Sequence, residues 1–181
     1  NPDVMGRYGT IDEFLQDLDR VVDELTTPEP EATVDPSEAR PDERIEGGFT
    51  VIRKMGRGSS ADVLLVREDG RGEEMVLKVA LDAGLNDRLT AEGEALSKLR
   101  HPNIVEWYEQ GMTRGQFWFA MEYVAGSNLE GLAKEHPGRY SVTEACRLTA
   151  QILKGLEQAH RMGFVHRDIK PENVLVSQGE H

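Results

Sequence analysis

The chain has 181 residues, enough for one ordinary domain, and a formal net charge of −12. The acidity lies at the start, because residues 1–46 hold 14 acids against 4 bases, whereas residues 47–181 hold 19 against 17. A nearly neutral remainder argues against a nucleic-acid-binding surface. The single cysteine, Cys146, cannot form an internal disulfide, and no apolar run is long enough to span a membrane. We therefore expect a soluble protein of the cytoplasm.

The first 46 residues separate into two segments. In residues 1–25, apolar side chains from Ile11 to Leu25 recur at helical spacing, with Thr10 placed to cap and Glu13 three residues later. This pattern predicts an amphipathic helix. Residues 26–46 hold four prolines among many acids and few large apolar side chains, which predicts an acidic linker without packed structure.

Residues 47–124 carry short runs of Val, Ile and Leu that are broken by glycines. The predicted strands are residues 49–52, 63–66, 75–79, 104–109 and 117–122, with a helix at about 87–99. Residues 125–181 then change to a helical pattern, with a long helix whose buried face runs from Val142 to Ala159, and end in a short strand at 174–176. Strands first and helices later predict an α+β protein in two lobes.

A glycine-rich stretch, Gly56 to Val63, lies between two of the predicted strands. Glycines there allow the backbone N–H groups to approach phosphate oxygens closely. By itself the pattern is equally typical of a simple hairpin turn.

Lys78 stands inside the apolar run at residues 75–79, where an unpaired ammonium would be costly to bury. Glu92 on the following predicted helix, together with nucleotide phosphates, could supply the anions. The alternative is an edge-strand lysine that reaches water.

The strongest signal is His166-Arg167-Asp168-Ile169-Lys170-Pro171-Glu172-Asn173. Asp168 and Asn173 lie five residues apart in a loop, so a carboxylate could orient an attacking hydroxyl while an amide oxygen holds a metal on the nucleotide. Lys170 could neutralise charge on a transferring phosphoryl group. A polar surface loop without chemistry is the weaker reading.

With these motifs, residues 49–176 resemble the eukaryotic-type protein kinase family, in its Ser/Thr branch and most like its bacterial members. Gly56, Gly58 and Val63 match the family's glycine-rich loop, and Ala61 replaces the third glycine. Lys78 matches the lysine that holds the α- and β-phosphates, with Val76 where alanine is usual.

The resemblance also implies a nucleotide site. The helix glutamate falls on Glu92, with Glu94 as the alternative, and Met121 is the gatekeeper. The backbones of Glu122 and Val124 would bond the adenine edge, and Leu175 would pack beneath the ring. The implied ATP-binding residues are Met55, Gly56, Gly58, Val63, Val76, Lys78, Glu92, Met121, Glu122, Val124, Asn128 and Leu175.

By the same resemblance, Asp168 is the catalytic base, Asn173 a magnesium ligand and Lys170 the phosphate contact. Arg167 matches the arginine that senses a phosphorylated activation loop, which implies regulation by phosphorylation. The cofactors implied are ATP and Mg²⁺, and the substrate is a protein Ser/Thr hydroxyl.

The family's Asp-Phe-Gly motif, with the principal magnesium ligand, is absent from the sequence. We therefore expect a fragment cut before that motif, inactive in isolation, from an active parent. Arg7-Tyr8 and Glu13-Phe14-Leu15 resemble the terminal helix of another kinase domain, which would make a tandem arrangement. The alternative is an unrelated amphipathic helix that docks on a partner or on the small lobe.

Two other functions remain open. A pseudokinase would keep the fold as a scaffold, although the residues it usually loses, Lys78, Asp168 and Asn173, are all present. A small-molecule phosphotransferase shares the Asp-to-Asn spacing, but Arg167 and Lys170 favour the protein kinases.

Overall fold

The computed structural model describes residues 11, 14–16, 18, 33–70, 72–138 and 140–177. The chain divides into two compact units, residues 1–32 and 33–181. In the first unit the described residues are all helical. The rest of the helix predicted for residues 11–25, and residues 26–32 of the predicted linker, lie outside the described residues.

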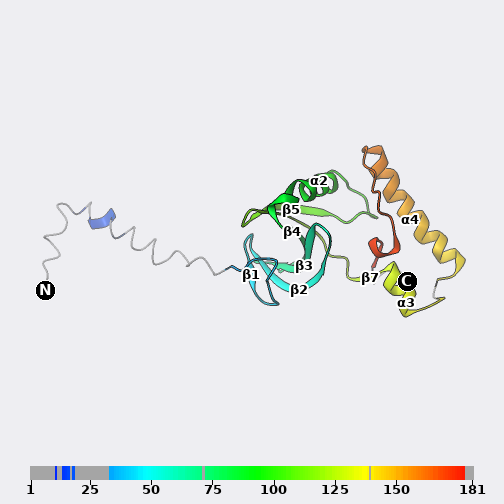
Figure 1. Ribbon diagram of the computed structural model, residues 1–181, viewed down its shortest axis with the longest axis horizontal. Coiled ribbons are helices and arrows are strands. Elements are labelled where there is room, and N and C mark those ends of the chain that lie inside the picture. The colour runs from blue at the N-terminus through cyan, green and yellow to red at the C-terminus, as the bar shows by residue number, and fades with distance from the viewer. Residues whose placement is uncertain are drawn as a thin grey trace. The chain divides into compact units, whose positions relative to one another are not determined.

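The second unit begins with an antiparallel sheet of six strands (Figure 1). Its spatial order is β1-β2-β3-β4-β6-β5. The strands are β1 (Arg44–Ile45), β2 (Phe49–Arg57), β3 (Ala61–Glu68), β4 (Glu74–Ala80), β5 (Trp107–Thr113) and β6 (Gln116–Glu122). The glycine-rich stretch is the tip of the β2–β3 hairpin, where the Gly58 N–H donates to the Ala61 carbonyl at 2.8 Å. We call residues 56–63 the glycine hairpin.

The two faces of this sheet are buried against different partners. Residues directly opposite one another on neighbouring strands share a face. On one face Leu64, Leu77 and Ala120 form a cross-strand row inside an apolar cluster, in which the Phe49 and Trp118 rings meet edge to face at 5.2 Å. The other face carries a second cluster that packs on helix α2 (Asn86–Ser97), which contacts β4, β5 and β6.

The second half of the predicted linker is packed structure. Residues 33–46, here called the cover segment, lie against the first apolar cluster, with Ile45 only 2% exposed and Val34 and Ala39 partly buried beside it. The Val34 N–H donates to the Arg44 carbonyl at 2.9 Å. The prediction of an unpacked linker was wrong for these residues because a few apolar side chains suffice when they cover an open sheet face.

The strand predicted for residues 104–109 begins later than expected, at Trp107. The Ile104 N–H donates to the His101 carbonyl at 2.9 Å, which makes a turn where a strand was predicted. Ile104 instead lies near Gly155, at which an added Cβ would come within 3.4 Å of the Ile104 side chain. The prediction for residues 104–106 was wrong because the chain turns there, and Ile104 is half-buried outside the sheet.

The remaining elements follow the sheet in the chain. They are β7 (Gly126–Asn128), α3 (Leu129–Glu135), α4 (Val142–Arg161) and β8 (Leu175–Ser177), with short 3₁₀ turns at Ala83–Leu85 and Pro171–Asn173. Helix α4 begins at a capping box in which the Ser141 hydroxyl accepts from the Glu144 N–H and the Glu144 carboxylate accepts from the Ser141 N–H. Among the described residues, no helix has the length and apolar character that crossing a membrane needs.

Candidate active site

Lys78 and Glu92 form an ion pair between the sheet and α2. Lys78 lies on β4, opposite Phe119 of β6, and its Nζ is 2.5 Å from the Glu92 Oε1. The ammonium also lies 5.9 Å from the centre of the Phe119 ring. The helix can approach closely because residue 93 is glycine, where an added Cβ would lie 3.1 Å from the Phe119 ring. Of the two glutamates considered from the sequence, Glu92 is the one that reaches Lys78.

Three of the predicted ATP-binding residues share a sheet face with Lys78. Val63 is the cross-strand partner of Lys78, and Val76, two residues before Lys78, is the partner of Met121. Val76 is buried, whereas Val63 and Met121 are half-buried. Met55 falls where the β2–β3 register shifts, and it is 40% exposed.

Glu122, the last residue of β6, has its backbone donor engaged. The Glu122 N–H donates to the Glu106 carbonyl at 2.8 Å. The carbonyl oxygen of Glu122 is therefore the backbone atom that could contact adenine. Within the described part of the chain, no hydrogen bond uses the Val124 backbone.

Asn128 and Leu175 lie side by side. They are cross-strand partners in the β7–β8 pair, and Leu175 is 48% exposed. The Asn128 side-chain oxygen accepts from the Gly131 N–H at 2.8 Å and caps α3, which leaves its amide N–H groups as the part available to a ribose.

Asp168 is surrounded by the other residues of the catalytic loop, residues 166–173. The Asn173 Nδ2 donates to the Asp168 Oδ2 at 3.0 Å and to the Asp168 carbonyl at 2.8 Å, and the Lys170 Nζ lies 3.2 Å from the same Oδ2. The hydrogen bond from Lys170, and next that from Asn173, hold the pKa of the Asp168 carboxyl below its ordinary value. The side chain is therefore an ionised carboxylate at neutral pH, the form that accepts a proton.

The backbone of the catalytic loop is shaped by two local features. Arg167 has φ +63°, an uncommon conformation for a residue other than glycine and one that is often found at functional sites. The Asp168 N–H faces the His166 Nδ1 at 3.3 Å, and the 3₁₀ turn at Pro171–Asn173 brings Asn173 back to Asp168. The five-residue spacing thus closes a compact polar loop.

The residues of the catalytic loop fit a magnesium ion. Because both contacts of Asn173 with Asp168 use its amide nitrogen, its oxygen is the atom that could ligate a metal, and Mg²⁺ prefers oxygen ligands. The described residues contain no group of three or more His, Cys, Asp or Glu side chains that could hold a metal ion. An ion at Asn173 would therefore need further oxygens from outside this set, such as nucleotide phosphates.

No hydrogen bond or ion pair among the described residues joins the Lys78–Glu92 pair to the catalytic loop. Their convergence on one triphosphate thus stays a prediction. One charged residue within the glycine hairpin was given no role from the sequence: Asp62, which is 1% exposed. The signal was available, because strand alternation places it on the same face as Leu64 and Val66.

Comparison with known proteins identifies the family. The protein kinase domain matches residues 49–181, most of the chain. This chain belongs to the protein kinase family. The kinase is 35% identical over 153 residues to a Bifidobacterium longum protein named "Probable serine/threonine-protein kinase pknA2", a match that covers 80% of this chain and 20% of that protein. It is 33% identical over 136 residues to the serine/threonine-protein kinase PknI of Mycobacterium tuberculosis, covering 72% of this chain and 23% of PknI.

Solved structures agree with the kinase fold. The crystal structure of the M. tuberculosis PknI kinase domain superposes with a TM-score of 0.64 at 31% identity, covering 78% of this chain and 60% of that one. A structure of Rad53 residues 1–466 in complex with AMP-PNP gives a TM-score of 0.65 at 31% identity. That match covers 73% of this chain and 35% of the Rad53 chain. The antiparallel sheet with α2, followed by helices, is thus part of a two-lobe kinase fold. The kinase sequence spans only part of the length of these relatives.

Proposed function

We propose that the protein containing this chain is an ATP-dependent serine/threonine kinase that transfers the γ-phosphoryl group to protein hydroxyls. The observation that carries the proposal is the arrangement around Asp168, an ionised carboxylate that is hydrogen-bonded by Lys170 and Asn173. The resemblance of the motifs to Ser/Thr kinases, the family match and the names of the relatives support the same class.

The roles proposed for the residues follow from their chemistry. Asp168 orients the substrate hydroxyl and accepts its proton, while Lys170 stabilises negative charge on the phosphoryl group. Lys78, fixed by Glu92, binds the α- and β-phosphates beneath the glycine hairpin. Asn173 would hold magnesium, which when bound neutralises phosphate charge.

The rest of the proposed nucleotide site surrounds the adenine and the ribose. Val63, Val76, Met121 and Leu175 would enclose the adenine ring, and the Rad53 structure holds AMP-PNP, an ATP analogue, in a related fold. Arg167 is proposed to bind a phosphorylated activation loop, because a guanidinium pairs well with a phosphate.

Phosphate transfer by the full-length protein tests this function. Wild-type protein and the Asp168→Asn variant would be incubated with ATP labelled on the γ-phosphate, Mg²⁺ and a Ser/Thr peptide library. We expect the variant to lose about a hundredfold to ten-thousandfold in kcat, the usual contribution of general acid–base catalysis. Glu157→Gln, which removes an exposed carboxylate from α4, is the matched control and should keep wild-type activity. Equal labelling by wild type and Asp168→Asn would refute the assigned base.

Two further proposals accompany the function, a cytoplasmic location and a preceding kinase domain. A cytoplasmic location is consistent with Cys146, which is exposed and free, since reducing compartments keep such thiols unpaired. A preceding kinase domain is proposed from residues 1–25 alone. The coding sequence upstream of Asn1 would test it, because a second glycine-rich loop and a second catalytic loop should appear there.

A further inference from the structure

Asp62 is a buried carboxylate within the glycine hairpin. It lies on β3, next to Val63 of the proposed adenine site, but its side chain faces the opposite side of the sheet, with Leu64 and Val66. Only 2% of the side chain is exposed. A charge taken out of water in this way is costly unless it is paired and hydrogen-bonded.

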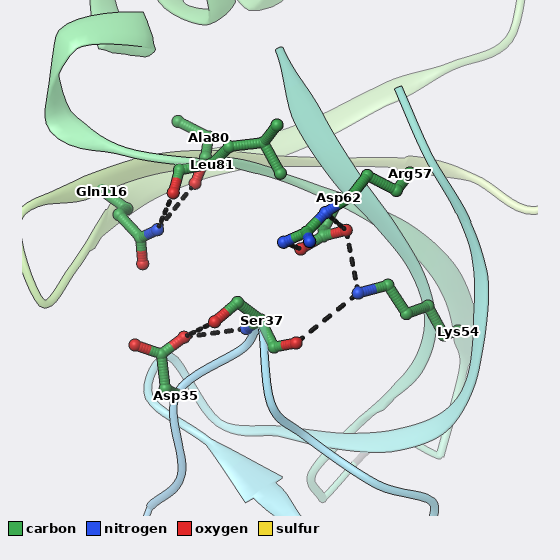
Figure 2. Close-up of polar contacts among 8 residues, drawn as sticks. All are labelled: Asp35, Ser37, Lys54, Arg57, Asp62, Ala80, Leu81 and Gln116. Atoms are coloured by element: carbon green, nitrogen blue, oxygen red, sulfur yellow. Dashed lines mark hydrogen bonds and ion pairs between the residues drawn. The ribbon is translucent and has the colours of Figure 1, made fainter. Parts of the chain in front are cut away.

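Two basic side chains from β2 provide that pairing (Figure 2). Arg57 donates from Nε to the Asp62 Oδ1 and from Nη2 to the Oδ2, both at 2.9 Å, which is a bidentate contact. The Lys54 Nζ lies 2.9 Å from the Oδ1. Arg57 stands between Gly56 and Gly58 and is the cross-strand partner of Asp62, so the contact fastens the backbone of the glycine hairpin itself.

The cover segment lies next to this charge cluster. The Lys54 Nζ is 3.5 Å from the Ser37 carbonyl oxygen, and the Ser37 N–H and hydroxyl both donate to the Asp35 Oδ1, at 2.8 and 2.6 Å. Figure 2 shows Lys54 between Ser37 and Asp62. Pro36, between the two turn residues, is fully buried. The family match begins only at Phe49, so the cover segment precedes the part that matches the kinase domain.

From these contacts we infer that Asp62 is a positioning residue for ATP: it holds the glycine hairpin in place through Arg57 and Lys54, and the cover segment shields it from water. The inference rests on the proposed ATP binding. A hairpin rich in glycine has many backbone states, and ordering it on the phosphates carries an entropic cost. An ion pair that limits those states before ATP arrives lowers that cost.

The test is steady-state kinetics of the full-length protein with the Asp62→Asn variant, which keeps the shape and removes the charge. We expect the KM for ATP to rise about tenfold, the factor for one charge-assisted hydrogen bond, while kcat at saturating ATP stays within about twofold. Arg57→Ala should give the same pattern, and the double variant should be no worse than either single one, because both remove one interaction.

The matched control is Glu74→Gln on β4, whose exposed carboxylate lies 3.8 Å from Arg67 at the other end of the β3–β4 pair. This substitution should leave the KM for ATP and kcat unchanged. Arg57→Ala and Lys54→Met remove the cationic partners from exposed positions, so they keep the inference testable if Asp62→Asn does not fold.

The outcomes separate this inference from the proposed function. If Arg57→Ala and Asp62→Asn melt at a lower temperature but keep the wild-type KM for ATP, Asp62 serves stability alone and the inference is overturned. If the wild-type protein shows no binding of ATP by calorimetry, the proposed function fails, and the inference fails with it.

Discussion

The Lys78 ammonium on β4 and the Glu92 carboxylate on α2 lie 2.5 Å apart and join the sheet to its helix. The pair is partly exposed, with Lys78 at 25% and Glu92 at 47% side-chain exposure. Its contribution to stability is therefore modest, because water screens ion pairs at the surface. Its main consequence is geometric, since it fixes where the lysine ammonium sits relative to the glycine hairpin.

The first prediction concerns this pair. Glu92→Gln should lower kcat/KM for ATP by about tenfold to a hundredfold, the range for one hydrogen bond to a charged group. The loss follows because Lys78 would no longer be held toward the phosphates. Kinase assays over a range of ATP concentrations on the full-length protein measure it. Glu94→Gln, two residues along the same helix, is the control, and equal effects of the two substitutions would contradict a specific role for Glu92.

The second prediction concerns the short β7–β8 pair. A Cβ added at Gly126 would overlap with the Val176 carbonyl oxygen, a backbone atom that cannot move without breaking the pairing. Gly126→Ala should therefore destabilise the protein by about 1–3 kcal/mol, typical of overpacking. Denaturant unfolding of the full chain measures the change.

A second readout tests what this pairing does for the site. Because Leu175 and Asn128 are partners in the same pair, Gly126→Ala should also weaken ATP binding. Ser127→Ala, a change of similar size at the next residue, serves as the control. Unfolding curves that coincide for Gly126→Ala and wild type would show that the two strands do not pair this closely.

The third prediction concerns the ionisation of Asp168. In the native protein its carboxyl pKa is lowered, first by the hydrogen bond from Lys170. Lys170→Ala should raise that pKa toward the ordinary value of 3.8. Carbon-13 NMR titration of the aspartate carboxyls in the full chain measures it. Lys134→Ala, which removes the partner of Glu130 on α3, should leave the Asp168 titration unchanged.

The sign of the linked stability effect follows from the direction of the shift. A carboxyl whose pKa is lower in the folded state stabilises the fold above its unfolded pKa, and this contribution is lost as the pH falls through the folded pKa. In Lys170→Ala the two pKa values approach each other, so the stability of the variant should depend less on pH in this acidic range. If the midpoint of the Asp168 titration in Lys170→Ala were identical to that of wild type, Lys170 would not contact the carboxylate in solution.

Features that lie within a short stretch of chain could be predicted from the sequence. The glycine hairpin, the strand that carries Lys78 and the catalytic loop each depend on neighbouring residues, and local spacing is enough to define them. The α+β order and the long helix α4 followed from periodicity for the same reason. Helix α3 was not predicted, because seven residues give too few turns for a periodic signal.

Features that depend on partners distant in the chain needed the tertiary structure. Glu92 and Glu94 are two positions apart on α2, and only the packing of Gly93 against Phe119 shows which of them faces Lys78. The packing of the cover segment was likewise not predictable, because neither composition nor spacing says which sheet face a Pro-rich segment will cover. The sequence by itself determined which side chains are proposed to carry the chemistry. Only the tertiary structure decided their partners and their exposure to water, since both arise from contacts between segments far apart in the chain.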